Sequence, residues 1–487
     1  MITYVIIGIT VVVSYICFGD HELFRKLAFI PYRTVHNNEW YRLITHGFVH
    51  ADMTHLLVNM FTFWSFGTYM ESAFGYLGLG TGGYLGLYFG GMVAASLYDL
   101  AMKTGAPIIG MLDCAGLRLQ EATDALHAFG TIFNKQAQAS GMIPQISAVF
   151  GMCGGGSAVI SAMSDFTLME KENGSLFINS PNALAGNEES RQNTAGAQFQ
   201  SEQAGNVDFV CETEEDLLEQ LRILVDVLPS DYEAEDAYFD NDDDLNRIIP
   251  ELNDAVYDAA AILKSVSDNG MYIETKAMYA KEMVTAFIRL NGETVGAVAN
   301  QPVDGESVLT RNGLEKAERF IKFCDAFAIP LLTVTNVTGL RANAHEERKQ
   351  ALALAKFTTT LAQVSVPRVN LIAGAAYGTA AEVMNSKAIG ADFVLAWPQA
   401  SVGMMDAEQA VRIMYAEEID ADDDKMALIA EKTAEYAEGQ NSALAAAKRG
   451  YVDDIIEPDA TRKRLIAAYE MLYGKKVTPV TKKHTAV

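Results

Sequence analysis

The chain has 487 residues, which is enough for two or three domains that each bury a core of their own. Its formal net charge of −25 argues against a nucleic-acid partner, because phosphate recognition needs a basic surface that this composition does not supply. The five cysteines lie far apart, without the paired spacing of a zinc site or a disulfide framework, and favour a reducing, cytosolic setting.

The N-terminal part of the chain is strongly apolar. Residues 2–18 form an almost unbroken apolar run of about the length of a short membrane span. Two further runs, His55–Tyr69 and Phe74–Ser96, are apolar, aromatic and rich in the small residues that let membrane helices pack closely. A signal peptide is the alternative for the first run, although a basic start and a small-residue cleavage site are missing. We therefore predict about three helical transmembrane spans over residues 1–96, inserted in a lipid bilayer.

Histidines and an asparagine follow the first apolar run, in the segment EWYRLITHGFVHADMTHLLVNMFTFWSFG. His46, His50 and His55 with Asn59 resemble the opening third of a rhomboid-family intramembrane protease. That family uses a later Gly-x-Ser-Gly serine as its nucleophile, and this chain has no such motif. The resemblance implies a rhomboid-like membrane protein without proteolytic activity. A zinc site made by the three histidines is a further alternative, although only the first pair has helical spacing.

Beyond Leu97 the chain contains an internal repeat. PIIGMLDCAGLR begins at Pro107 and PLLTVTNVTGLR begins at Pro330, a separation of 223 residues. The same separation relates IPQISAVFGMCGGG to VPRVNLIAGAAYGT, so that it pairs Pro144 with Pro367, Gly151 with Gly374, and Gly155 with Gly378. Several anchors at one separation indicate two copies of one α/β domain. Each copy is predicted as strand, glycine turn, helix, strand, glycine-rich turn, helix and strand.

The two copies differ at their start. The second opens with Val284–Pro302, which the Asn-Gly pair predicts to be a hairpin, followed by a helix over 311–328. The positions 223 residues earlier hold the membrane-like sequence, and only the helix end Leu97–Gly105 is in place. We therefore predict a truncated first domain with an uncovered sheet edge.

An acidic stretch, residues 231–244, separates the copies. A calcium loop would need a glycine after the carboxylates, and none is present, so a solvated linker is expected. The predicted organisation is a membrane segment, a truncated N-domain, an acidic linker and a C-domain, at residues 1–96, 97–230, 231–270 and 271–487.

A strand that ends in glycines and enters a helix directs backbone N–H groups at one point, where they can hold an anion. Such turns are Cys153–Ser157 (CGGGS) in the first copy and Ala376–Ala380 (AYGTA) in the second. One turn alone could be purely structural, but two at equivalent places favour two oxyanion holes. Cys153 could be a nucleophile or a small packed residue, and no histidine partner is identifiable for it.

The segments GAPIIGMLDCAGLRLQE, FGMCGGGSAVISAMSDF, VANQP, AAYGTAAEVMNSKAIGADFVLAWPQASVGMM and RGYVDDIIEPDATRKRLIAA resemble the carboxyltransferase subunits of propionyl-CoA carboxylase, transcarboxylase and the sodium-pumping decarboxylases such as methylmalonyl-CoA decarboxylase. The similarity spans residues 97–472. It implies two crotonase-like domains, each a ββα superhelix, in a homo-oligomer whose active site lies between the N-domain of one subunit and the C-domain of another. It also implies carboxyl transfer between biotin and a coenzyme A thioester. The implied partners are a biotin carboxyl carrier protein and biotin carboxylase or membrane decarboxylase subunits.

The same resemblance assigns residues to the reaction. Gly155 and Gly156 are implied to hold the thioester enolate, and Gly378, Thr379 and Ala380 the ureido carbonyl of biotin. The implied substrate-binding residues are Ala115, Gly116, Arg118 and Tyr377. Thr379 departs from the family's usual glycine, and Cys114–Leu117 replaces a more glycine-rich turn. Arg118 and Arg341 could supply positive charge near coenzyme A or could hold the turn.

Both resemblances stop near Ser96, each as part of a family's full length, which suggests a fused or misassembled reading frame. The alternatives are a membrane-associated carboxyltransferase with its catalytic part in the cytoplasm, and a rhomboid-type membrane protein whose soluble part is incidental.

Overall fold

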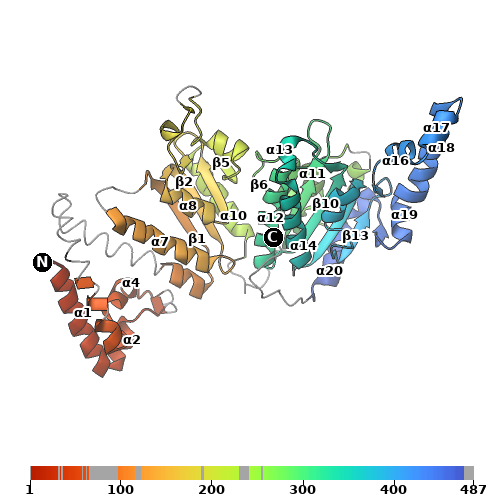
Figure 1. Ribbon diagram of the computed structural model, residues 1–487. Helices are drawn as coiled ribbons and strands as arrows, with labels where there is room; N and C mark the ends of the chain where they lie inside the picture. The colour runs from red at the N-terminus through yellow and green to blue at the C-terminus, as the bar shows by residue number, and fades with distance from the viewer. Residues whose placement is uncertain are drawn as a thin grey trace.

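The computed structural model describes residues 2–30, 33–34, 37–57, 59–61, 63–64, 68, 97–116, 122–187, 191–229, 241–253 and 256–475. The chain forms three successive parts (Figure 1): a group of N-terminal helices, a first α/β domain, and a second α/β domain from which helices project at the far end.

The N-terminal part contains α1 (Ile2–Gly19), α2 (His21–Leu27) and α4 (Arg42–Thr45). The Arg42 side chain is buried and donates hydrogen bonds of 2.7 Å to the carbonyls of Arg25 and Ala28. A guanidinium has five donors in a rigid plane, which suits it to tie several carbonyls together. The end of α2 is therefore joined to α4 by polar contacts.

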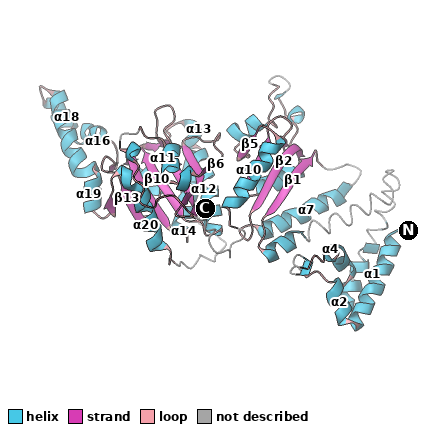
Figure 2. Cartoon of the chain, turned by 180° about the vertical axis from the view of Figure 1, so that it is seen from behind, coloured by secondary structure: helices cyan, strands magenta, loops and turns pink. Residues whose placement is uncertain are grey.

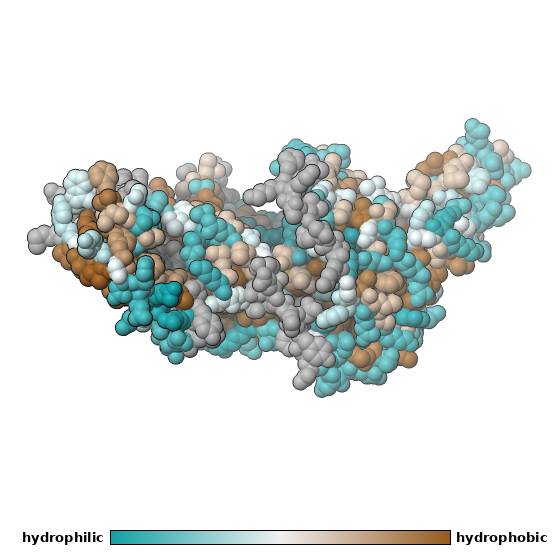
Figure 3. Space-filling model, turned by 90° about the horizontal axis from the view of Figure 1, so that it is seen from below, coloured by the Kyte–Doolittle hydropathy of each residue, from teal (hydrophilic) through white to brown (hydrophobic). Residues whose placement is uncertain are grey.

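Helix α1 buries its small polar side chains and exposes its large apolar ones. Thr3, Thr10 and Ser14 are buried, whereas Val12 and Tyr15 are exposed. Apolar groups also colour the left end of the face in Figure 3, where these helices lie. Within the described ranges, α1 is the one helix long and apolar enough to cross a membrane, a criterion that a signal sequence also meets. The second predicted span is described only in part and the third lies outside the described residues, so the three-span prediction remains a prediction.

The first domain is a parallel sheet in the order β1-β2-β3-β5, with β4 paired to β2 beyond the end of β3. Helix α10 packs on one face and α8 on the other. The elements are β1 (Ile108–Cys114), α7 (Ala122–Ala139), β2 (Gln145–Gly154), α8 (Gly156–Met163), β3 (Phe166–Glu170), β4 (Ser175–Phe177), β5 (Phe209–Cys211) and α10 (Glu214–Val227).

The second domain has the larger sheet, in the order β15-β13-β12-β10-β8-β7-β6, with β14 paired to β12. Helices α11 and α20 cover one face, and α12 and α14 cover the other (Figure 2). The elements are α11 (Ala259–Val266), β6 (Tyr272–Thr275), β7 (Met283–Leu290), β8 (Glu293–Asn300), β9 (Val308–Leu309), α12 (Arg311–Ala326), β10 (Leu331–Val337), β11 (Gly339–Leu340), α13 (Ala344–Glu347), α14 (Gln350–Gln363), β12 (Arg368–Tyr377), α15 (Gly378–Val383), β13 (Phe393–Ala396), β14 (Ser401–Gly403), α16 (Ala407–Met414), α17 (Ala416–Ala421), α18 (Lys425–Tyr436), α19 (Ala443–Lys448), β15 (Asp454–Ile455) and α20 (Thr461–Leu472).

The predicted opening hairpin of the second copy is confirmed. Strands β7 and β8 are antiparallel and are joined through Asn291 and Gly292, whose φ values are 53° and 82°. Positive φ at both central residues suits the two-residue turns that match the twist of a hairpin. The helix predicted over 311–328 is α12.

The internal repeat holds at the level of strand register. The β1–β2 ladder begins with Ile108 beside Gln145, and the β10–β12 ladder with Leu331 beside Arg368. Both ladders shift register at the same point, so that Cys114 lies beside Cys153 and Val337 beside Ala376. All four pairs of corresponding positions keep the separation seen in the sequence, so the two copies share one backbone design.

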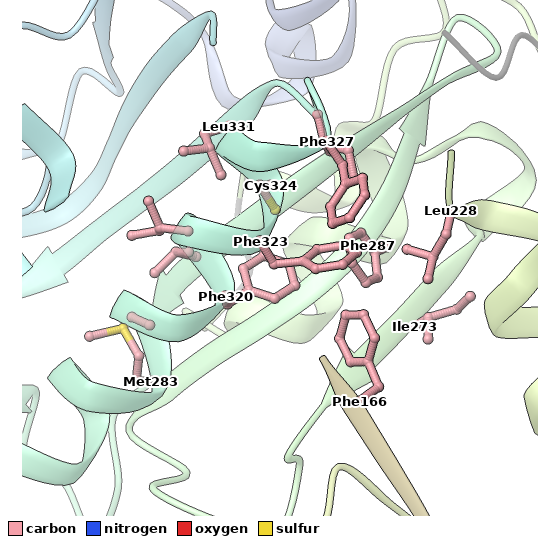
Figure 4. Packing of buried hydrophobic residues seen from close by; sticks show 14 of the residues in the cluster. Phe166, Leu228, Ile273, Met283, Phe287, Phe320, Phe323, Cys324, Phe327 and Leu331 are labelled. Carbon is pink, nitrogen blue, oxygen red and sulfur yellow. The ribbon is translucent and has the colours of Figure 1, made fainter. Parts of the chain in front are cut away.

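Aromatic side chains join the two domains (Figure 4). Phe166 of β3 packs edge-on against Phe323 of α12, with ring centroids 4.8 Å apart, and against Phe287 of β7 at 5.9 Å. The Nζ of Lys276 lies 3.4 Å from the carboxylate of Asp208, and both groups are buried. The domains therefore share one continuous core.

The acidic segment is only in part the solvated linker that we predicted. Its residues 230–240 lie outside the described ranges, but Asp243 is nearly buried and forms a bidentate hydrogen bond to Arg247 at 2.9 Å. The fully buried Arg462 of α20 lies 3.6 Å from Asp243 and 2.7 Å from Asp268. The pKa of Asp243 is lowered, chiefly by the bond from Arg247. Arg247 and Arg462 thus draw the end of this segment onto the second domain.

Candidate active-site turns

The first glycine-rich turn lies where β2 ends and α8 begins. Gly155 has a φ of 58°, and a Cβ added there would meet no heavy atom within 4 Å. The turn therefore faces open space, in a conformation that favours glycine. The N–H of Gly155 donates to the carbonyl of Phe177 on β4 at 2.9 Å.

Gly156 and Ser157 are the first residues of α8, so their amides have no carbonyl one helical turn earlier to bond. A Cβ at Gly156 would lie 2.7 Å from the ring of Phe129, so packing also requires glycine there. Since the Gly155 amide already has an acceptor, the available donors lie one residue further along than the sequence indicated.

The second turn repeats this conformation. Gly378, at the start of α15, has a φ of 59°, and both Gly378 and Thr379 are exposed whereas Ala380 is buried. Tyr377 precedes them, and its hydroxyl donates to the Oγ of Ser401 at 3.0 Å. Tyr377 thus links the turn to β14.

A matched pair of side chains, which the sequence analysis did not single out, supports the two turns. An oxygen of Asp113 accepts the N–H of Met152 at 3.0 Å, and Asn336 accepts the N–H of Ala375 at 3.0 Å. Both acceptors lie where the ladder changes register, so each binds an amide that the shift leaves unpaired. A Cβ at Gly151 or Gly374 would come within 2.4 Å of that oxygen. The repeat carries the signal, because Asp113 and Asn336 are also 223 residues apart.

The structure brings Ala115 and Gly116 to the first turn. A Cβ at Gly154 would lie 2.6 Å from the carbonyl oxygen of Ala115, so the two loops touch through their backbones. Gly116 has a φ of 124°. Arg118 lies outside the described residues, and its predicted role remains a prediction.

A cavity of ≈ 740 Å³ lies beside the corresponding loop of the second domain. Pro302, Asn336 and Arg341 line it. The Nη2 of Arg341 lies 3.4 Å from Glu306, and both side chains are partly exposed to solvent. Asn300 accepts the N–H of Asn336 at 3.2 Å, which ties the VANQP segment to this loop.

Cys153 is a packed residue and not a nucleophile. It is fully buried, and burial raises the pKa of its thiol to about 12, with a further rise from Cys114. A thiol with such a pKa is not ionised at neutral pH. His127 and His345 are exposed on α7 and α13. In the described part of the chain no hydrogen bond or ion pair joins the first turn to the second, which belong to different domains.

The sequence matches the Carboxyl transferase domain family over residues 82–487 and the Rhomboid domain family over residues 37–117. The carboxyltransferase subunit of propionyl-CoA carboxylase from Haloferax mediterranei is 38% identical over 399 residues, which cover 80% of this chain and 77% of that protein. The alpha subunit of methylmalonyl-CoA decarboxylase from Propionigenium modestum is 36% identical over 397 residues, which cover 79% of this chain and 77% of that protein.

Among solved structures, a transcarboxylase 12S crystal structure with methylmalonyl-coenzyme A and methylmalonic acid bound superposes with a TM-score of 0.76 at 33% identity. The match covers 81% of this chain and 78% of that one, which assembles as a hexamer. Family, relatives and fold agree over the region of the two glycine turns. The chain therefore belongs to the carboxyl transferase domain family, the acyl-CoA carboxyltransferases.

Proposed function

We propose that this chain transfers a carboxyl group between carboxybiotin and an acyl-CoA, by backbone amides at two equivalent turns. The repeated turn carries this proposal: Gly155 and Gly378 have φ values of 58° and 59° at the start of short helices. Helix starts present free N–H groups and a positive dipole, which stabilise an oxygen that gains negative charge.

At the first turn, the amides of Gly156 and Ser157 would bind the thioester oxygen as the enolate forms. The open space in front of Gly155 leaves room for that oxygen. One such donor contributes roughly 100-fold to 1,000-fold to turnover. Ala115, Gly116 and Arg118 would line the acyl-CoA side of this site.

At the second turn, the amides of Gly378, Thr379 and Ala380 would hold the ureido carbonyl of biotin. The chain's residues fit that group because amide donors suit a neutral carbonyl and Tyr377 walls the turn. Biotin, delivered on a carrier protein, supplies the carboxyl group and the nitrogen that takes the α-proton. Replacing glycine by Thr379 keeps the backbone donor and adds an exposed hydroxyl.

The partners of this chain follow from the separation of the two turns. Because they lie in different domains, a complete site would combine the first domain of one copy with the second of another. We accordingly propose a homo-oligomer with two crotonase-like domains in each chain, a biotin carboxyl carrier protein, and biotin carboxylase or membrane decarboxylase subunits as partners.

The N-terminal helices would associate the chain with a lipid bilayer. Helix α1 turns its apolar side chains outward, the opposite of a helix in a water-soluble core. Proteolysis is not proposed, because the Gly-x-Ser-Gly serine is absent from the sequence.

The test of the proposed reaction uses a version in which residues before Leu97 are replaced by the corresponding opening of the Haloferax mediterranei relative. Labelled carboxyl should move from carboxybiotin to propionyl-CoA, or from methylmalonyl-CoA to biotin. Absence of transfer in both directions, with the hexamer assembled and both ligands bound, would refute the proposal.

A further inference from the structure

Strand β1 is the edge of the first sheet, whereas its counterpart β10 lies inside the second sheet. Strand β10 pairs with β12 on one side and with β8 on the other, where Leu331 lies beside Gly296. Strand β1 pairs with β2, and across the described residues no strand pairs with its other edge.

The side chains of β1 show the same difference. Ile109 lies beside Ile146, and Met111 beside Ala148, with α10 covering only the members on β2. Ile109 is 39% exposed and Met111 is 63% exposed. The corresponding Leu332 and Val334 are each 0% exposed, in a cluster that contains the hairpin residues Ala297 and Ala299.

We propose that β1 is a strand-addition site, and that its occupant is a β-hairpin of the β7–β8 type supplied by a separate polypeptide. An unpaired edge offers a row of N–H and C=O groups, and main-chain bonds to such an edge are an established mode of peptide recognition. The second domain supplies the template for the register, because β10 already binds such a hairpin in the same chain.

That template specifies the contacts. The N–H of Gly296 donates to the carbonyl of Pro330 at 2.8 Å, and Pro107 is the residue that corresponds to Pro330. The first strand bond of the added hairpin should therefore be accepted by Pro107. The small residues Ala297 and Ala299 would lie beside Ile109 and Met111, which leaves room for the larger Met111.

A second copy of this chain is the competing occupant, through antiparallel pairing of two β1 edges. Its net charge of −25 opposes association of like copies, whereas an uncharged hairpin meets no such repulsion. The hairpin is therefore the occupant that the observations favour.

The test is direct binding of a labelled peptide, Tyr272–Asn300, to the purified full chain in detergent, followed by fluorescence anisotropy. We expect saturable binding of one peptide per chain. A peptide N-methylated at Gly296 and Val298, the residues that alternate toward β10, should bind roughly 10-fold to 100-fold more weakly. N-methylation at Val295 and Ala297 would interfere with the hairpin itself and serves only to test hairpin formation.

Variants of the chain provide matched controls. Met111→Lys should weaken binding about tenfold or more, because it places a charge beneath the added strand. Met426→Lys, at a methionine that is 69% exposed on α18, should leave binding unchanged. Both side chains are exposed, so neither change threatens folding.

No saturable binding, equal affinity for the N-methylated peptide, or equal affinity for the Met111→Lys chain would overturn the proposal. A dimer of the full chain that Met111→Lys dissociates would identify the second copy as the occupant and would also overturn it. Binding is measured without carboxyl transfer, so its outcome is independent of the proposed reaction.

Discussion

Asn336 occupies in the second domain the place that Asp113 occupies in the first, and each accepts the amide that follows a glycine, at 3.0 Å. A carboxylate and a carboxamide thus perform one structural task, since both offer an oxygen acceptor.

Replacing Asn336 by alanine should therefore lower stability by about 1 kcal/mol and loosen the β12 turn, because the N–H of Ala375 loses its acceptor. Asn336→Asp should keep the bond and most of the stability, as Asp113 does in the first copy. Denaturant unfolding of both variants checks this. Equal losses for the two would show that the oxygen acceptor is not what matters.

Gly155→Val should reduce turnover of the version with a restored opening by roughly 100-fold to 1,000-fold, since the side chain would fill the space before the first turn. Affinity for the biotin carrier should change little, because that ligand is proposed for the second turn. Gly186→Val is the matched control, at a glycine with φ of 82° and no heavy atom within 4 Å of an added Cβ. Comparable loss in both variants would assign the effect to backbone strain.

Stability should fall as pH rises from about 4 to about 6, through Asp165. Burial raises the pKa of this carboxyl to about 6, so the folded chain holds a proton that the unfolded chain has already released in this range. The loss is about 2 to 3 kcal/mol at full ionisation. Melting temperatures across this window should show a smaller decline for Asp165→Asn, which cannot ionise. An unchanged decline would exclude Asp165 as its source.

The chain as it stands should have little or no carboxyltransferase activity compared with the version that carries a complete opening. Met111 is 63% exposed where Val334 is 0% exposed, so a core layer of the first domain is absent within the described residues. Burial contributes roughly 25 cal/mol per Å², and a hairpin's worth amounts to several kcal/mol against a net stability of about 5 to 15. A coupled assay with biotin carrier and acyl-CoA compares the two, and equal rates would contradict the prediction.

The full chain should sediment with membranes and resist carbonate extraction, since α1 turns Val12 and Tyr15 outward. Removing residues 1–96 should move the remainder into the soluble fraction if it folds. Fractionation followed by immunodetection measures this. Recovery of the full chain without detergent would argue against a membrane segment.

The sequence by itself determined the duplicated α/β architecture and the place of both turns. Glycines at equivalent positions need no tertiary information to be recognised, because positive φ and close approach restrict those positions to glycine. The hairpin over Val284–Pro302 and the difference between the two openings followed from the same repeat.

Only the tertiary structure decided which groups are available for chemistry. That the amide of Gly155 is bound to Phe177, that Cys153 is buried, and that Asp243 meets Arg462 depend on segments far apart in the chain. Local sequence specifies backbone conformation, but hydrogen-bond partners and burial arise when distant segments pack together. For this reason the donors moved from Gly155 to Gly156 and its neighbour, and the acidic segment became in part a structural contact.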